Sequence, residues 1–394
     1  MPTLPLTEQQ RNGLYNFKFL IDDWVTACNP VCKPRRVRFE QIDAQAWKME
    51  ARIEFQRWHQ DIEIEILASD VETAGLSLEA AGGLFRKLKR HLENSYAEAF
   101  YEDNYIQIFE RDFTTISRRR RLKPESCRFC RRPASEVSFK ARAHALPNSI
   151  GNIAIFCEDE CDDCNHLFGS TIENDFGNWS SLHRTFAQIS GKSGYPTFKT
   201  KKGSRIETIN SVITITSAKD QEIIDVDKEN NRVKVTVALP FAPIGVYKTF
   251  CKIALSLLSK KDLADYNDLS DWIRGSKDWQ HPRCIIAQCF IPGQMINPGR
   301  ATIFKKRDPI SSLPSHILVV GFGYFIYQIA LPEQFADIPP VYKLPPFSTA
   351  IRALIHVQES LTVADMRSKT AIEYGQAKTL GHTEFIGDRM SIEF

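Results

Sequence analysis

The stretch that decides the central fold begins with Cys127-Arg128-Phe129-Cys130 and ends, after thirty intervening residues, with Cys161-Asp162-Asp163-Cys164. Two residues separate the cysteines of each pair, which is the spacing of a zinc knuckle, and two knuckles supply the four thiolates that tetrahedral zinc prefers. Charged neighbours such as Arg128 and Asp163 argue against a plain core of reduced cysteines. The pattern therefore predicts a structural Zn²⁺ site, with Cys157 as a rival ligand.

The N-terminal segment and the cysteines outside the two knuckles indicate in which cellular compartment the protein is expected. Met1 to Thr7 lacks the basic segment and apolar run of a secretory signal, and the most apolar segment, Ile317 to Leu331, is interpreted as a buried strand pair rather than a membrane helix. We therefore expect a cytoplasmic protein without membrane association, in which thiols stay reduced. The cysteines outside the cluster are then interpreted as small buried side chains: Cys28, Cys32, Cys251, Cys284 and Cys289.

The charge distribution is uneven along the chain. The net charge is only +3, yet residues 111–150 contain eleven basic and three acidic side chains, whereas residues 151–175 contain seven acidic side chains and neither lysine nor arginine. A basic segment followed by an acidic one is typical of a polyanion-binding surface beside a cation site.

Composition and periodicity predict a multidomain α+β protein. The hydrophobic fraction of 43% and the charged fraction of 25% are those of an ordinary globular chain. Ile62, Ile64 and Ile66 alternate with acidic residues, as in a half-buried strand, and residues 76–101 have helical spacing. Further strands are expected at 232–239, 284–291, 301–305 and 317–331, with a helix at 245–258. The predicted domains are 1–117, 118–205 and 206–394, of which the first and last are α+β domains that flank a zinc-containing centre.

The residues between the two knuckles, and those directly after the second, form a motif that is similar to a known one. His144 is followed by an apolar-Pro-x-Ser-Ile-Gly turn, and the second knuckle runs into Asn165, then Phe168-Gly169 and Ile172-Glu173. This order resembles the HNH endonuclease family, and the specific motif covers about residues 127–175.

That resemblance implies a ββα-metal core in which His144, on the first strand, is the general base that activates a water. It also implies that Asn165 helps to bind one catalytic cation, Mg²⁺ or Mn²⁺. One departure is that Ala143 stands where many members have a carboxylate ligand. Glu173 is the first candidate to replace it, because it lies about two helical turns beyond Asn165. The alternatives are Asp175, Glu160 and Asp163.

Basic residues around this core are candidates for nucleic-acid binding, because guanidinium and ammonium groups pair with phosphates. They are Arg118, Arg119, Arg120 and Arg121 ahead of the first knuckle, and Lys192 and Lys199 in a segment, residues 191–205, that is expected to be an exposed loop. The expected function is a metal-dependent endonuclease that hydrolyses phosphodiester bonds in DNA, with RNA as the alternative substrate. The resemblance adds restriction or antiviral defence as a setting.

Two alternatives remain open at this point. The first is a catalytically weak or inactive zinc-containing protein that binds nucleic acid or senses a ligand, which Ala143 favours. The second is a zinc module that only joins domains. A homodimer, a regulatory ligand and a protein partner are also left open.

Overall fold

The computed structural model describes residues 5–28, 37–55, 58–116, 124–192, 194–199, 203–209, 212–216, 218, 224–227, 232–278, 284–291, 295–311, 313–332, 361–365, 372–379 and 390–393. The chain forms two compact units, Met1–Asn104 and Tyr105–Phe394. The α+β class is confirmed, because each unit combines helices with largely antiparallel sheets. The division into three domains stays a prediction.

Unit 1 packs three helices against a three-stranded antiparallel sheet. Its elements are α1 (Glu8–Cys28), β1 (Val37–Gln41), β2 (Ala46–Phe55), β3 (Trp58–Leu67), α2 (Ala68–Ala74) and α3 (Leu78–Asn104), and the strand order is β1-β2-β3. Phe17 and Ile21 of α1 are buried with Trp47 and Met49 of β2 in one core. The strand predicted from alternating isoleucines is β3, and the helix predicted at 76–101 is α3.

Unit 2 contains the sequence motifs and a six-stranded antiparallel sheet of order β14-β10-β13-β12-β11-β4. Its strands are β4 (Tyr105–Asp112), β10 (Ile285–Phe290), β11 (Ile296–Lys306), β12 (His316–Gly323), β13 (Phe325–Ala330) and β14 (Leu361–Asp365). Two smaller sheets have the orders β5-β6-β7 and β15-β16-β9-β8. They comprise β5 (Phe198–Lys199), β6 (Arg205–Ile209), β7 (Val212–Thr216), β8 (Ile224–Asp227), β9 (Arg232–Phe241), β15 (Ile372–Thr379) and β16 (Met390–Glu393).

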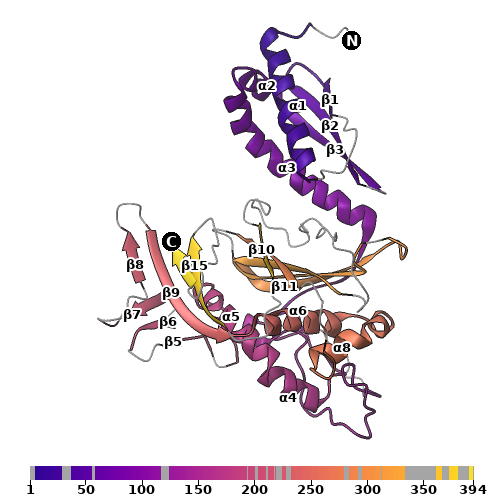
Figure 1. Ribbon diagram of the computed structural model, residues 1–394, viewed down its shortest axis with the longest axis vertical. Helices are drawn as coiled ribbons and strands as arrows, with labels where there is room; N and C mark the ends of the chain where they lie inside the picture. Colours follow the sequence, from indigo (N-terminus) through magenta and orange to yellow (C-terminus); the bar gives the residue numbers. More distant parts are fainter. Residues whose placement is uncertain are drawn as a thin grey trace. The chain divides into compact units, whose positions relative to one another are not determined.

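The helices of unit 2 lie on one side of the large sheet (Figure 1). They are α4 (Asp162–Ser170), α5 (Ile172–Phe186), α6 (Pro243–Leu257), α7 (Lys260–Leu263) and α8 (Asn267–Ile273), with short 3-10 turns at Asn148–Ile150 and Ala264–Tyr266. Ring contacts join the layers: the centroid of Tyr327 in β13 lies 5.1 Å from that of Trp179 in α5 and 5.4 Å from that of Phe250 in α6. The core is therefore shared between the motif region and the C-terminal half of the chain.

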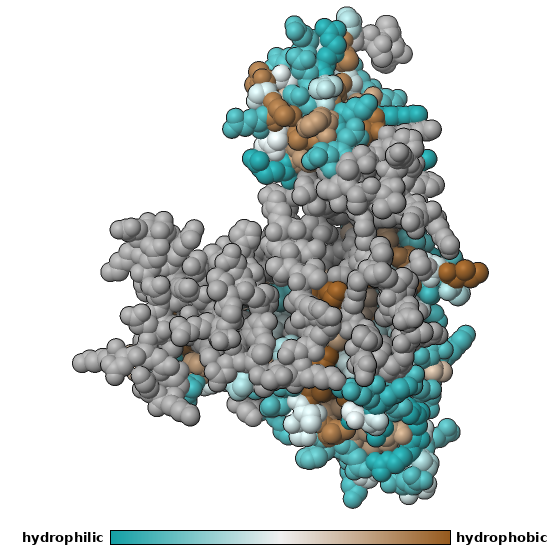
Figure 2. All heavy atoms as spheres, viewed as in Figure 1, coloured by the Kyte–Doolittle hydropathy of each residue, from teal (hydrophilic) through white to brown (hydrophobic). Residues whose placement is uncertain are grey.

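The predicted strand pair at 317–331 is confirmed as β12 and β13. Every residue of β12 is buried, so this strand reads as a continuous apolar run instead of an alternating one. None of the helices in the described ranges combines the length and hydropathy that a membrane crossing requires. Hydrophilic side chains predominate on the visible surface around α4 and α8 (Figure 2). The predicted cytoplasmic location stays a prediction.

Candidate metal centre and adjoining site

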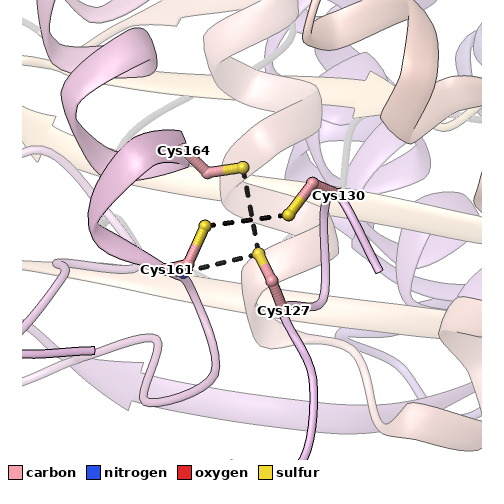
Figure 3. A group of neighbouring side chains, drawn as sticks. All are labelled: Cys127, Cys130, Cys161 and Cys164. Carbon is pink, nitrogen blue, oxygen red and sulfur yellow. Dashed lines mark hydrogen bonds between the residues drawn. The ribbon is translucent and has the colours of Figure 1, made fainter. Parts of the chain in front are cut away.

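The four predicted zinc ligands converge on one point. The sulfur atoms of Cys127, Cys130, Cys161 and Cys164 all lie within 4.8 Å of one another, with 3.8 Å between Cys127 and Cys164 and 3.7 Å between Cys130 and Cys161. Figure 3 shows the side chains pointing inward from the first knuckle and from the start of α4. A tetrahedral zinc with bonds of about 2.3 Å requires sulfurs about 3.8 Å apart. The cluster could therefore hold a structural metal ion such as zinc.

The cluster favours a thiolate at Cys127. The hydrogen bond with Cys164 and the backbone N–H groups of Cys130, Cys161 and Phe129 lower the pKa of Cys127 to about 4, against the opposing effect of burial. Cys157 is not part of the cluster: its thiol is buried, its pKa is raised by desolvation, and it lies 3.6 Å from Asp159 Oδ1. The structure thus selects four ligands and leaves the rival outside.

Arg128 docks the first knuckle onto α6. Its guanidinium contacts both carboxylate oxygens of Asp159 at 2.7 and 3.2 Å. It also donates to the carbonyl oxygens of Leu255 and Leu258 at the end of α6. Carbonyls at the end of a helix lack partners within it, so the largely buried guanidinium of Arg128 satisfies them. The knuckle is therefore tied to a helix that lies more than a hundred residues away in the sequence.

His144 lies on a short antiparallel ladder directly before the stapled helix. Residues 144 and 156 form a bridge, Ala145 N–H donates to Ile155, and Cys157 N–H donates to Ala143. The imidazole is half-buried and packs on the ring of Phe156, with 4.7 Å between centroids. This pairing is a single bridge with one hydrogen bond on either side, and no β-strand of the described residues contains His144. The expected ββα core therefore stays a prediction.

Asn152 fixes the turn between the two extended segments. Its side chain is fully buried; its amide nitrogen donates to the carbonyls of Leu146 and Ile155, and its amide oxygen accepts from the N–H groups of Ala154 and Ile155. The sequence reasoning did not assign Asn152 a role. The sequence feature that could have indicated this turn is the pair Gly151-Asn152, because both residue types favour turns. In the structure Gly151 has a φ of 85°, which suits glycine.

Asn165 and Glu173 do not lie on one helix, so the expectation of a continuous helical face is wrong. α4 ends at Ser170, and Thr171 has φ −120° and ψ −96°, outside the helical region. The hydroxyls of Ser170 and Thr171 bond to carbonyls of the preceding turn, which competes with helix continuation. Glu173 therefore lies in the first turn of α5. Asn165 is half-buried in α4.

Lys252 of α6 extends into this region, and the sequence reasoning missed it. Its ammonium lies 3.2 Å from Glu160 Oε2 and 3.1 Å from Glu173 Oε1, and it donates to the His144 carbonyl at 2.7 Å. The side chains of Lys252 and Glu160 are 1% and 0% exposed, and that of Glu173 is 20% exposed. We call these three side chains and the His144 carbonyl the Lys252 cluster.

Burial lowers the pKa of Lys252, but Glu160 and Glu173 outweigh it, so its pKa lies above the ordinary value and the ammonium stays charged. Burial raises the pKa of Glu160 to about 7 although Lys252 opposes it. For His144, burial and then Lys252 lower the pKa, and Glu173 offsets part of this effect. A neutral imidazole at physiological pH is the form that can accept a proton.

The alternative carboxylates all have partners. Glu160 belongs to the Lys252 cluster, and Asp163 pairs with Arg132 at 2.5 Å. Asp175 accepts from the N–H of Ala242 ahead of α6, and Gly245 leaves room for it, because a Cβ there would lie 2.1 Å from Asp175 Oδ2. Glu173 is the carboxylate of this group that lies in the Lys252 cluster and is still partly exposed. It stays the first candidate for a cation ligand.

The residues predicted to bind nucleic acid are placed only in part. Arg118 to Arg121 lie outside the described residues. Lys192 and Lys199 are both exposed, and Lys192 is close enough to lower the pKa of His144. The predicted loop 191–205 contains β5 and the bridge between Gly191 and Gly194.

The chain was compared with models of protein families, with curated proteins and with solved structures, and no match was found in any of the three. Functional inference therefore rests on the residues and on the geometry of the site.

Proposed function

We propose that the protein is a metal-dependent endonuclease that hydrolyses phosphodiester bonds in DNA. The observation that carries the proposal is the position of His144 on a short ladder in front of a helix held by four cysteines. No hydrogen bond from a residue within the described ranges engages the ring nitrogens of His144, so they are open to a water molecule. His144 is the general base in this proposal, and its lowered pKa keeps it neutral for that role.

A catalytic cation, Mg²⁺ or Mn²⁺, would stabilise the charge that develops on the phosphate during hydrolysis. Asn165 and Glu173 are the side chains proposed to hold it. The side-chain amide of Asn165 forms no hydrogen bond to another described residue, and only one carboxylate oxygen of Glu173, Oε1, contacts Lys252. Lys192 and Lys199 would contact phosphates of the substrate. We further propose antiviral defence or restriction as the setting.

One observation favours a second candidate function. Ala143 supplies no ligand, and Glu173 is already neutralised in part by Lys252, so cation binding could be weak. In that case the protein would bind nucleic acid without cutting it.

The test is cleavage of plasmid DNA by the full chain with Mg²⁺ or Mn²⁺. Loss of a general base lowers rates by about 10²- to 10⁴-fold, so we expect a loss of that order in His144→Ala. His166→Ala is the matched control, because His166 is an exposed histidine of α4, and it should cut like the wild type. The wild-type rate should fall as the pH decreases through the lowered pKa of His144. DNA binding without cutting under any cation would reject the nuclease and support the second candidate.

A further inference from the structure

An open cavity of about 720 Å³, with a mixed polar and apolar lining, lies beside the proposed catalytic site. Its walls are residues 147–149, which follow His144 in the motif, one face of α5, and residues 196–199. Glu173 of the Lys252 cluster is also part of the wall, so the cavity and the surroundings of His144 share a carboxylate. The volume is within the range of about 300–1,000 Å³ that is typical of small-molecule sites.

The walls of this cavity are held in place by hydrogen bonds from two buried residues, Arg184 and Thr185. Arg184, which is 8% exposed, donates to the carbonyls of Ser149 and Gly177 at 3.2 and 3.0 Å and to Ser180 Oγ at 3.2 Å. Thr185 Oγ1 lies 3.2 Å from the Pro196 carbonyl oxygen and 2.9 Å from that of Ser181, and its one proton is shared between these acceptors. Arg184 and Thr185 thus tie both loops to α5. The shape of the cavity is therefore fixed by contacts of the folded chain.

Several polar groups of the walls have no partner among the described residues. Asn148 Oδ1 is buried and accepts no hydrogen bond. The side chains of Asn174, Ser181 and Thr197 line the cavity and form no hydrogen bond to any other residue that the structure describes. Amide and hydroxyl groups offer donors and acceptors without charge, which is the chemistry that recognises the edges of a nucleobase.

The remaining lining fits the other parts of a nucleotide. Phe198 is half-buried and lines the cavity, where an aromatic ring can stack on a base. Lys199 is exposed at the same wall and can pair with a phosphate. The hydrocarbon chain of a lipid would leave the uncharged hydrogen-bonding groups without matching partners, and an uncharged peptide would leave Lys199 without an anionic partner.

We propose that this cavity binds a single nucleotide, with the base among Asn148, Asn174 and Ser181, and the phosphate near Lys199. The proposal rests on the proposed function in that the nucleotide is expected to be an unstacked residue of the substrate strand. A free mononucleotide presents the same chemistry and is distinguished below. Binding of an unstacked residue makes single-stranded or locally opened nucleic acid the preferred substrate.

The test measures binding to the full chain that carries His144→Ala, so that cleavage does not interfere. The probes are a fluorescently labelled single-stranded DNA dodecamer, the same strand with abasic positions, and a nucleoside monophosphate. We expect Ser181→Phe, which fills the cavity, and Asn174→Ala to weaken binding of the dodecamer about tenfold. Lys260→Ala, at an exposed position of α7, is the control and should bind like the parent.

The outcomes separate the two sources and the two proposals. Abasic positions should weaken binding to the parent but not to Ser181→Phe, which supports a strand nucleotide. Displacement of the dodecamer by micromolar mononucleotide would instead identify a free ligand as the occupant. Equal dodecamer and mononucleotide binding by the parent and both cavity variants would overturn the cavity proposal, even if the wild type cuts DNA. Cavity-dependent binding by a wild type that never cuts would reject the nuclease alone.

Discussion

Two buried clusters in unit 2 are built in opposite ways. The four-cysteine cluster takes its side chains from 38 consecutive positions, Cys127 to Cys164, in two pairs of fixed spacing. The Lys252 cluster takes its groups from positions 144, 160, 173 and 252, which are distant in the sequence and are brought together only by the fold. The first is a motif that sequence spacing reveals. The second follows from how α6 packs.

The two clusters also stabilise the fold by different means. In the four-cysteine cluster, a bound metal ion such as zinc would hold the two segments together, and its free energy of binding would be gained only in the folded state. In the Lys252 cluster an ammonium offsets the desolvation of two carboxylates, so the net contribution is small while the complete set is present. Removal of one member of the Lys252 cluster should therefore lower the free energy of unfolding by more than the intact cluster contributes to it.

The largest expected effect is loss of the metal. Cys164→Ser should abolish stoichiometric zinc and lower the free energy of unfolding by more than about 5 kcal/mol, because metal binding is coupled to folding. Cys157→Ser is the matched control, since Cys157 is buried outside the cluster, and it should keep the zinc. Elemental analysis and denaturant unfolding measure both. Zinc retained by Cys164→Ser would refute the assignment of this ligand.

The second effect concerns the Lys252 cluster. Lys252→Met leaves the buried carboxylate of Glu160 without its counterion and should lower the free energy of unfolding by about 3–5 kcal/mol. The double variant Lys252→Met/Glu160→Gln should recover at least half of that loss, whereas Lys260→Met, at an exposed position of α7, should change little. Additive losses in a double-mutant cycle would show that the two side chains are not coupled.

The third expected effect is a pH dependence of the free energy of unfolding that is caused by His316, a buried histidine that stays neutral. His316 of β12 is 2% exposed, and burial lowers its pKa to about 4 although Asp262 opposes this. The unfolded chain takes up this proton near pH 6.5 and the folded chain near pH 4, so stability is lost as the pH falls between these values.

From pH 7.5 to pH 5 this loss should be about 2 kcal/mol larger in the wild type than in His316→Gln. Urea unfolding of both proteins at the two pH values measures the difference. Identical pH dependence would mean that His316 keeps its ordinary pKa in the folded chain.

The smallest effect belongs to an exposed ion pair of the first knuckle. Arg131 Nη2 lies 2.7 Å from Asp271 Oδ2, with side chains 44% and 23% exposed. Arg131→Gln should change the free energy of unfolding by at most about 1 kcal/mol and leave the zinc bound. A loss comparable to that of Lys252→Met would show that exposed and buried ion pairs contribute alike here.

The sequence by itself determined the features that depend on local spacing. The two Cys-x-x-Cys pairs predicted the cluster, alternation predicted β3, and the apolar run at 317–331 predicted the pair of β12 and β13. These succeeded because knuckle geometry, strand pleat and burial of a central strand are set by residues within a few positions of one another.

Only the tertiary structure decided which distant side chains meet. Lys252 belongs to an apolar helix whose sequence does not indicate a buried ammonium, and the sequence offered Glu160 only as an alternative cation ligand. The interruption at Thr171 separates Asn165 from Glu173, because side-chain hydroxyls compete for the helix carbonyls. The cavity likewise arises where two loops meet α5. Pairing of charges across such distances depends on how the layers pack, which no local pattern encodes.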